Sequence, residues 1–312
     1  MPKHCSIYVF HATYELSQFS FFDISTDKVY FKVKSSSFSK SPLCQALSND
    51  DNLKATCYFS GAYLESLKDQ QKELNAIRGF VENDQIELLL GTYHHSFSCL
   101  FSSSLFKMEI AMHQELMAQE FGAAPKGFLN TAAIFSNELL PTLLKEGISY
   151  TIAPRVTWYL GNQPSSRVFK SKDDRLRLVL VGNSTDDKEV IVSYLPGYVS
   201  RHWDMETVMV SEVVAADQQL KEYSLPNPIG LDPEGRDLTH FLGNSLQKQV
   251  FKQINDLAEK VYKSTNQELK SALLTLGSPA IFDLISQEYT IRYDYYTSLM
   301  NCLTDMELRL DS

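Results

Sequence analysis

Short apolar runs alternate with longer amphipathic segments through the first two thirds of the chain. The longer segments, such as 62–83 and 104–122, repeat their apolar residues with the period of a helix. Gly122 ends the second segment as a helix C-terminal glycine would. This alternation predicts an α/β fold built of βα units around a parallel sheet. The runs expected to form strands are 6–11, 53–61, 85–93, 126–130, 148–154, 175–182 and 189–195.

A barrel is the simplest closed form of such a sheet, and a doubly wound open sheet is the alternative. The doubly wound form usually carries a glycine-rich phosphate turn after its first strand. Here His11, Ala12 and Thr13 follow the first strand instead, which favours the barrel.

The pattern changes near residue 238, after which long helical periodicity continues without strands. The segment 226–237, dense in proline and glycine, is the expected connection. We therefore predict a barrel domain over 1–237 and a helical lobe over 238–312, packed on the barrel.

The composition of this 312-residue chain limits the classes of partner that it could bind. The net charge of -9, with no basic run longer than two residues, predicts that the chain does not bind nucleic acid. No apolar run approaches the ~18 residues that span a bilayer, and no signal peptide is apparent, so we expect neither membrane insertion nor secretion. The five cysteines are odd in number and widely spaced, which predicts reduced thiols in a cytoplasmic protein.

Polar residues follow several of the predicted strands, where barrel enzymes place their active sites. His11 follows the first strand, and Tyr93, His94 and His95 follow the third. Neutral imidazole both donates and accepts hydrogen bonds, so two histidines at two strand ends could hold sugar hydroxyls. No carboxylate stands beside them and no Gly-x-Ser-x-Gly elbow occurs, so we expect no metal, no cofactor and no serine triad of that type.

Five stretches, in order along the chain, resemble glycoside hydrolase family 57 and its α-amylase-like members. FGAAPKGFLNTAAIFSNELL is similar to the family's Phe-Gly-x-x-Pro-x-x-Phe-Arg-Asn-Thr-Glu-Leu-Ile-Tyr-Ser-Asn, and IELLLGTYHHSFSCLFS to its Glu-Leu-Leu-x-x-Thr-Tyr-Tyr-His-Ser. One such match would be weak, but five in sequence order are specific. The other three stretches are SIYVFHATYELSQFSFFDI, ATCYFSGAYLESL and DPEGRDLTHFLGNSLQ.

The resemblance implies an incomplete, irregular (β/α)7 barrel with a C-terminal helical lobe. It also implies retaining hydrolysis or transfer of α-glucans, carried out by a Glu nucleophile and an Asp acid/base. The nucleophile position falls on Ala132. The acid/base position falls on Ser193, or on Asp204 in a less favoured match. A third possibility is that its segment is deleted, because the chain between Arg175 and Ser211 is shorter than in the family.

Several residues that the resemblance places at the site survive, although Ala12 and Thr13 replace the Gln and Pro of the family's His-Gln-Pro. The resulting prediction is a catalytically degenerate pseudoenzyme of carbohydrate metabolism that binds α-1,4-glucan or maltooligosaccharide, or a protein partner. One alternative is an active retaining α-glucan hydrolase or transferase with a displaced carboxylate. The other alternative is a partner-binding scaffold with no sugar site. The predicted substrate-binding residues are His11, Tyr93, His95, Asn130 and Asn244.

Overall fold

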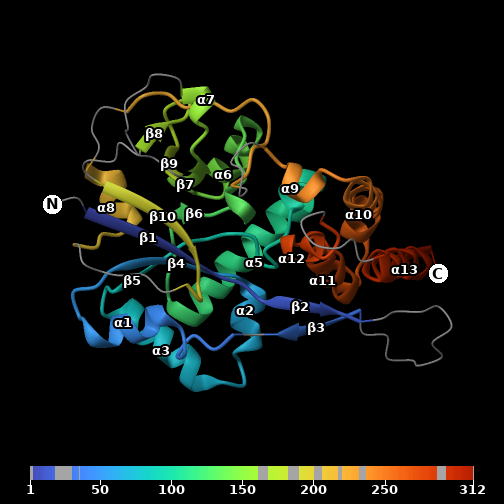
Figure 1. Cartoon of the computed structure of the whole chain (residues 1–312), viewed down its shortest axis with the longest axis horizontal. Coiled ribbons are helices and arrows are strands. Elements are labelled where there is room, and N and C mark those ends of the chain that lie inside the picture. The colour runs from blue at the N-terminus through green and yellow to red at the C-terminus, as the bar shows by residue number, and fades with distance from the viewer. Residues whose placement is uncertain are drawn as a thin grey trace.

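The computed structural model describes residues 3–17, 30–34, 36–160, 168–181, 190–199, 206–216, 220–231, 237–286 and 293–311. Parallel strands run in the order β10-β1-β4-β5 in one sheet and β6-β7-β9 in another, where β8 pairs antiparallel with β9 (Figure 1). A parallel bridge between Leu90 and Phe128 joins the two sheets. The strands are β1 (Lys3–Phe10), β4 (Ala55–Phe59), β5 (Ile86–Leu88), β6 (Gly127–Phe128), β7 (Tyr150–Pro154), β8 (Val168–Lys170), β9 (Arg177–Val181) and β10 (Val190–Pro196).

Seven of these strands, all except β8, form an incomplete, irregular barrel, and each predicted run contains or overlaps one of the seven. The barrel is incomplete because, within the described ranges, no strand pairing joins β9 to β10. It is irregular because β6 is only two residues long. The strands are apolar on both faces, as expected when a parallel sheet is covered on both sides.

Alternate residues of the strands divide between two cores. Residues such as Ile7, Ile152 and Val179 fill the barrel interior together with side chains from both sheets. Tyr8 and Phe59 face outward and pack against the surrounding helices. The helices before the lobe are α1 (Pro42–Asn49), α2 (Gly61–Ser66), α3 (Gln71–Glu82), α4 (Ser98–Phe101), α5 (Ser103–Phe121), α6 (Leu140–Lys145), α7 (Thr157–Leu160) and α8 (Val210–Ala216).

The helix predicted over 104–122 corresponds to α5, and Gly122 ends it in the left-handed conformation at φ 60°. The single helix predicted over 62–83 is wrong, since α2 and α3 are separate. The Leu67 carbonyl accepts the Gln70 N–H at 2.7 Å in the turn between them. The polar run 68–73 offers no apolar side chain to hold a continuous helix against the sheet.

The helical lobe contains α9 to α13, shown in orange and red in Figure 1. Its core is not separate from the barrel, because Phe97, Phe101 and Ala132 from the barrel loops belong to the same apolar cluster. The division at 237/238 stays a prediction, and residues 232–236 of the expected connection lie outside the described residues. The helices are α9 (Thr239–Leu242), α10 (Ser245–Lys263), α11 (Gln267–Leu276), α12 (Pro279–Asp283) and α13 (Tyr293–Asp311).

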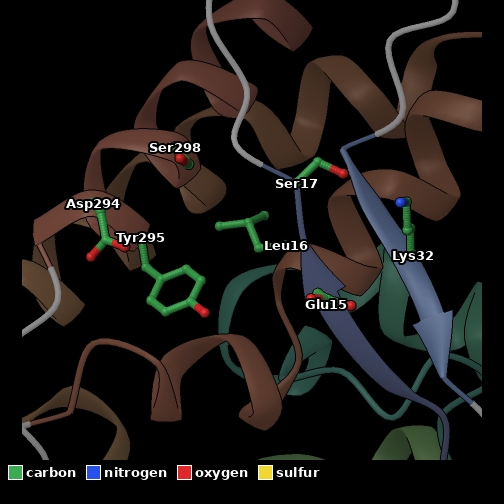
Figure 2. A pocket seen from close by; sticks show the side chains of 7 residues that line it. All are labelled: Glu15, Leu16, Ser17, Lys32, Asp294, Tyr295 and Ser298. Atoms are coloured by element: carbon green, nitrogen blue, oxygen red, sulfur yellow. The ribbon is translucent and has the colours of Figure 1, made fainter.

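A hairpin of β2 (Thr13–Leu16) and β3 (Phe31–Lys34) reaches from the barrel to α13. The Tyr30 hydroxyl donates to Asp305 of α13 at 2.6 Å. A cavity of about 310 Å³ lies between the hairpin and α13, and Figure 2 shows the side chains that line it. It is lined by Glu15, Leu16, Ser17, Lys32, Asp294, Tyr295 and Ser298. Among the described helices, none combines the length and apolar character needed to cross a bilayer.

Two glycines of neighbouring helices should respond oppositely to the same substitution. A Cβ at Gly61 would lie 2.3 Å from the buried Tyr93 ring, whereas a Cβ at Gly79 inside α3 would meet nothing within 4 Å. Gly61→Ala is therefore expected to lower the free energy of unfolding by about 1–3 kcal/mol through overpacking. Gly79→Ala should raise it by about 0.5–1 kcal/mol. Urea unfolding of both variants tests this, and an equal effect at the two positions would contradict the packing described here.

Candidate active site

Two histidine rings stack where the chain leaves β1 and β5. The centroids of His11 and His95 lie 4.6 Å apart with the planes at 14°. The Tyr58 ring of β4 lies 5.5 Å from His95. The structure thus brings together two of the predicted substrate-binding residues at the carboxyl end of the barrel, where sites of parallel barrels lie.

His95 is held in an unusual state for a histidine. Its backbone is left-handed at φ 54°, and its N–H closes a turn onto the Thr92 carbonyl at 3.1 Å. The side chain is buried, and Nδ1 has no hydrogen-bond partner within the described part of the chain. A buried polar atom without a partner costs about 1–3 kcal/mol, so this nitrogen is suited to meet a ligand or water.

Both rings are neutral near pH 7. Burial lowers the pKa of His95 well below its usual range, and the nearby His11 lowers it further. Burial also lowers the pKa of His11, whose Nδ1 lies 3.1 Å from the Ala12 carbonyl. Two neutral imidazoles offer both donors and acceptors, which suits hydroxyl groups better than anions.

A wholly buried carboxylate, not predicted from the sequence, anchors the loop 91–98. Glu109 of α5 is 0% exposed and accepts the His94 backbone N–H at 2.8 Å. It also accepts the hydroxyl hydrogens of Ser96 and Ser98. The sequence signal was an acidic residue on a face of the helix predicted over 104–122 that is apolar apart from it and His113. Hydrogen bonds from three residues compensate for burying its charge.

A second buried helix residue, His113, ties the ends of β4 and β5 together. Its Nδ1 accepts the Gly91 N–H at 3.1 Å, so Nε2 carries the hydrogen and donates to the Phe59 carbonyl at 2.8 Å. Burial lowers the pKa of His113 to about 4. The neutral ring therefore maintains this clamp at physiological pH.

The stretch after β6 is backbone-strained. Ala132 and Ala133 adopt φ 50° and φ 49°, a conformation that non-glycine residues rarely take. The Ala132 carbonyl accepts the Leu231 N–H at 2.7 Å, and the Thr131 hydroxyl lies 2.9 Å from that of Thr92. Ala132 is 8% exposed and packs in the core of the lobe. The loops after β5 and β6 are thus locked to each other.

Three other predicted binding residues have their side chains engaged within the protein. Asn130 donates to the Ile134 carbonyl at 2.9 Å, and Asn244 caps α10 while donating to the Ile285 carbonyl at 2.7 Å. The Tyr93 ring covers Gly61, and burial together with a hydrogen bond to Glu65 raises the pKa of its hydroxyl. Their substrate-binding roles stay predictions, whereas the contacts above show their structural roles.

Of the two positions considered for the acid/base, Ser193 and Asp204, only Ser193 is among the described residues. Ser193 lies inside β10 beside Ser6, with its hydroxyl 3.2 Å from His4 Nε2. Side chains point alternately to the two faces of a strand. Because the neighbouring Tyr194 packs against the barrel-interior cluster, Ser193 faces away from that cluster. Asp204 lies outside the described residues. Across the described ranges, no three His, Cys, Asp or Glu side chains gather closely enough to hold a metal ion.

One family model and one curated relative match most of the chain. The model of glycosyl hydrolase family 57 matches residues 3–198. A curated protein of Methanocaldococcus jannaschii, named "Putative alpha-amylase", is 23% identical over 275 residues, which cover 71% of this chain and 59% of that protein. The chain therefore spans about three fifths of the length of this relative.

Solved structures share the fold at low sequence identity. The GH57-type branching enzyme from Pyrococcus horikoshii superposes with a TM-score of 0.73 at 9% identity, covering 98% of this chain and 88% of that chain. The 4-alpha-glucanotransferase from Thermococcus litoralis gives a TM-score of 0.67 at 12% identity, covering 96% of this chain and 59% of that chain. The family model matches well over half of the residues, and this match establishes that the chain belongs to glycosyl hydrolase family 57.

Proposed function

We propose that this member of family 57 binds α-1,4-glucans but does not hydrolyse them. The observation that carries the proposal is Ala132, which the family resemblance aligns with the glutamate nucleophile. A methyl group cannot attack an anomeric carbon. General acid catalysis alone gives roughly 10²–10⁴-fold acceleration. Glycosidases need far more, since enzymes typically reach about 10⁶-fold or higher.

Neighbouring residues do not supply an obvious substitute for the nucleophile. Asn137 carries an amide that donates to the Ser224 hydroxyl at 2.8 Å and accepts the Leu225 N–H at 3.2 Å. Glu138 lies six residues after Ala132, in the 3-10 turn Asn137–Leu139 that begins the next helical segment. The alternative of a displaced carboxylate rests on Asp204.

Retention of a sugar site is supported by the histidine pair. His11 and His95 present neutral rings at the carboxyl end of the barrel, and the buried Nδ1 of His95 lacks a partner among the described residues. A saccharide hydroxyl would supply that hydrogen bond. The relatives' names, alpha-amylase, branching enzyme and 4-alpha-glucanotransferase, point to α-glucans as the ligand class. The wide spacing and odd number of cysteines support a cytoplasmic location as part of the same proposal.

Titration calorimetry with maltoheptaose tests the binding site. The wild-type chain should show saturable heat without cleavage products. His95→Asn, which keeps a residue tolerant of the left-handed backbone, should weaken binding about tenfold by losing one hydrogen bond to the ligand. Tyr262→Phe on an exposed face of α10 is the control and should bind as wild type. Absence of heat would exclude glucan recognition and favour a protein-binding role, whereas appearance of maltooligosaccharide products would favour the displaced-carboxylate alternative.

Restoring the nucleophile alone should not restore hydrolysis. Ala132→Glu supplies one carboxylate, but a retaining mechanism needs a second about 5–5.5 Å away. Product analysis on maltoheptaose should therefore detect no turnover for Ala132→Glu, as for the isosteric control Ala132→Gln. Circular dichroism must first show that both variants fold, because each places a long side chain at a strained and buried position. Hydrolysis by the Glu variant and not by the Gln variant would reveal an acid/base within the chain.

A further inference from the structure

A relay of three side chains lies at the junction of barrel and lobe, separate from the stacked histidines. The Ser271 hydroxyl of α11 lies 3.0 Å from His94 Nε2, and His94 Nδ1 lies 3.2 Å from Glu109 Oε1. The three residues come from the lobe, the loop after β5 and α5 (Figure 1). Hydroxyl, imidazole and carboxylate in this order form the geometry of a nucleophile, its base and the group that orients the base.

The Glu109 carboxylate determines which nitrogen of His94 carries hydrogen. Oε1 accepts the His94 backbone N–H at 2.8 Å, and Oε2 accepts the hydroxyl hydrogens of Ser96 and Ser98. Both oxygens therefore act as acceptors, and Nδ1 has to donate its hydrogen to Oε1. In neutral imidazole the other nitrogen is then an acceptor. His94 Nε2 accordingly accepts the hydrogen of the Ser271 hydroxyl.

Exposure increases along the relay in the direction that a reaction needs. Glu109 is 0% exposed and His94 is 5% exposed, while Ser271 is exposed at the surface of α11. The carboxylate and the imidazole are thus fixed by packing, whereas the serine lies at the protein surface. His94 also departs from the second Tyr of the family-like Thr-Tyr-Tyr-His-Ser, so the relay depends on a residue in which this chain differs from that pattern.

We propose that Ser271, His94 and Glu109 form a second site that catalyses acyl transfer from small, soluble esters to water. Ser271 is the nucleophile, His94 is the general base, and Glu109 positions His94. The Ser271 oxygen attacks the ester carbonyl while its proton passes to His94 Nε2. That proton then goes to the departing alcohol, which leaves an acyl-serine. Water, deprotonated by His94, releases the carboxylic acid and restores the serine.

In this proposal, Tyr14 stabilises the oxyanion. Its hydroxyl is hydrogen-bonded to Thr275, which lies one helical turn after Ser271 on the same face of α11. Burial raises the pKa of Tyr14 to about 12, so the hydroxyl keeps its hydrogen at physiological pH. A single donor near a carbonyl oxygen suits activated and small esters more than amides.

Labelling with a fluorophosphonate probe tests the nucleophile directly. The full chain is incubated with the probe, and peptide mass spectrometry locates the adduct. We expect modification of Ser271 at least tenfold faster than of Ser48, an exposed helical serine whose hydroxyl only donates to the Cys44 carbonyl at 2.8 Å. Ser271→Ala should abolish the fast adduct and lower 4-nitrophenyl acetate hydrolysis about tenfold or more. Equal labelling of the two serines, or unchanged hydrolysis in Ser271→Ala, would overturn the proposal.

The role of Glu109 is separated from general damage by two variants of the same network. Glu109→Gln replaces the acceptor that orients His94, whereas Ser96→Ala removes one donor and leaves the carboxylate. Ser271 labelling should slow about tenfold in Glu109→Gln and stay within about twofold of wild type in Ser96→Ala. Added imidazole should restore labelling in His94→Ala. Equal loss in Glu109→Gln and Ser96→Ala, or no rescue by imidazole, would contradict the assigned roles and leave the network structural.

Discussion

The barrel mouth depends on one wholly buried carboxylate. Glu109 reaches from α5 into the loop after β5 and accepts hydrogen bonds from the backbone of His94 and from the Ser96 and Ser98 hydroxyls. Burying a charge costs several kcal/mol unless such bonds compensate, so this loop cannot relax without exposing an unpaired charge. The constraint fixes the turn that carries His95, and through it the stacked ring of His11.

This rigidity allows the protein to keep strained backbone at the ends of β5 and β6. His95, Ala132 and Ala133 are left-handed, and each costs about 1–3 kcal/mol in that conformation. The strain persists because Glu109 fixes one loop and the hydrogen bond from Leu231 to the Ala132 carbonyl fixes the other. Strained positions of this kind gather at functional sites in proteins. In this chain two of them, His95 and Ala132, are positions that the family resemblance assigns to binding and catalysis.

The sequence predicted the architecture well because the strands are short, continuous apolar runs that alternate with longer segments of helical period. The strand pattern placed His11 and His95 at strand ends, and in the structure their rings stack. The break between α2 and α3 was missed because the surrounding apolar residues keep helical spacing across a turn. Glu109 and Ser271 were missed because helical periodicity cannot show which polar residue on a helix faces a distant loop. Only the folded chain brings residues 94, 109 and 271 together.

The lobe completes the barrel mouth instead of standing beside it. Ala132 and Phe97 of the barrel loops pack in the core of the lobe, and the Phe97 N–H donates to the Gly277 carbonyl at 2.8 Å. His94 contacts Ser271 of the lobe through one nitrogen and Glu109 of the barrel through the other. A displacement of α11 would therefore break the His94 hydrogen bond and open the cluster that covers Ala132. The lobe and the strained loops therefore stabilise each other, although more than a hundred residues separate them along the chain.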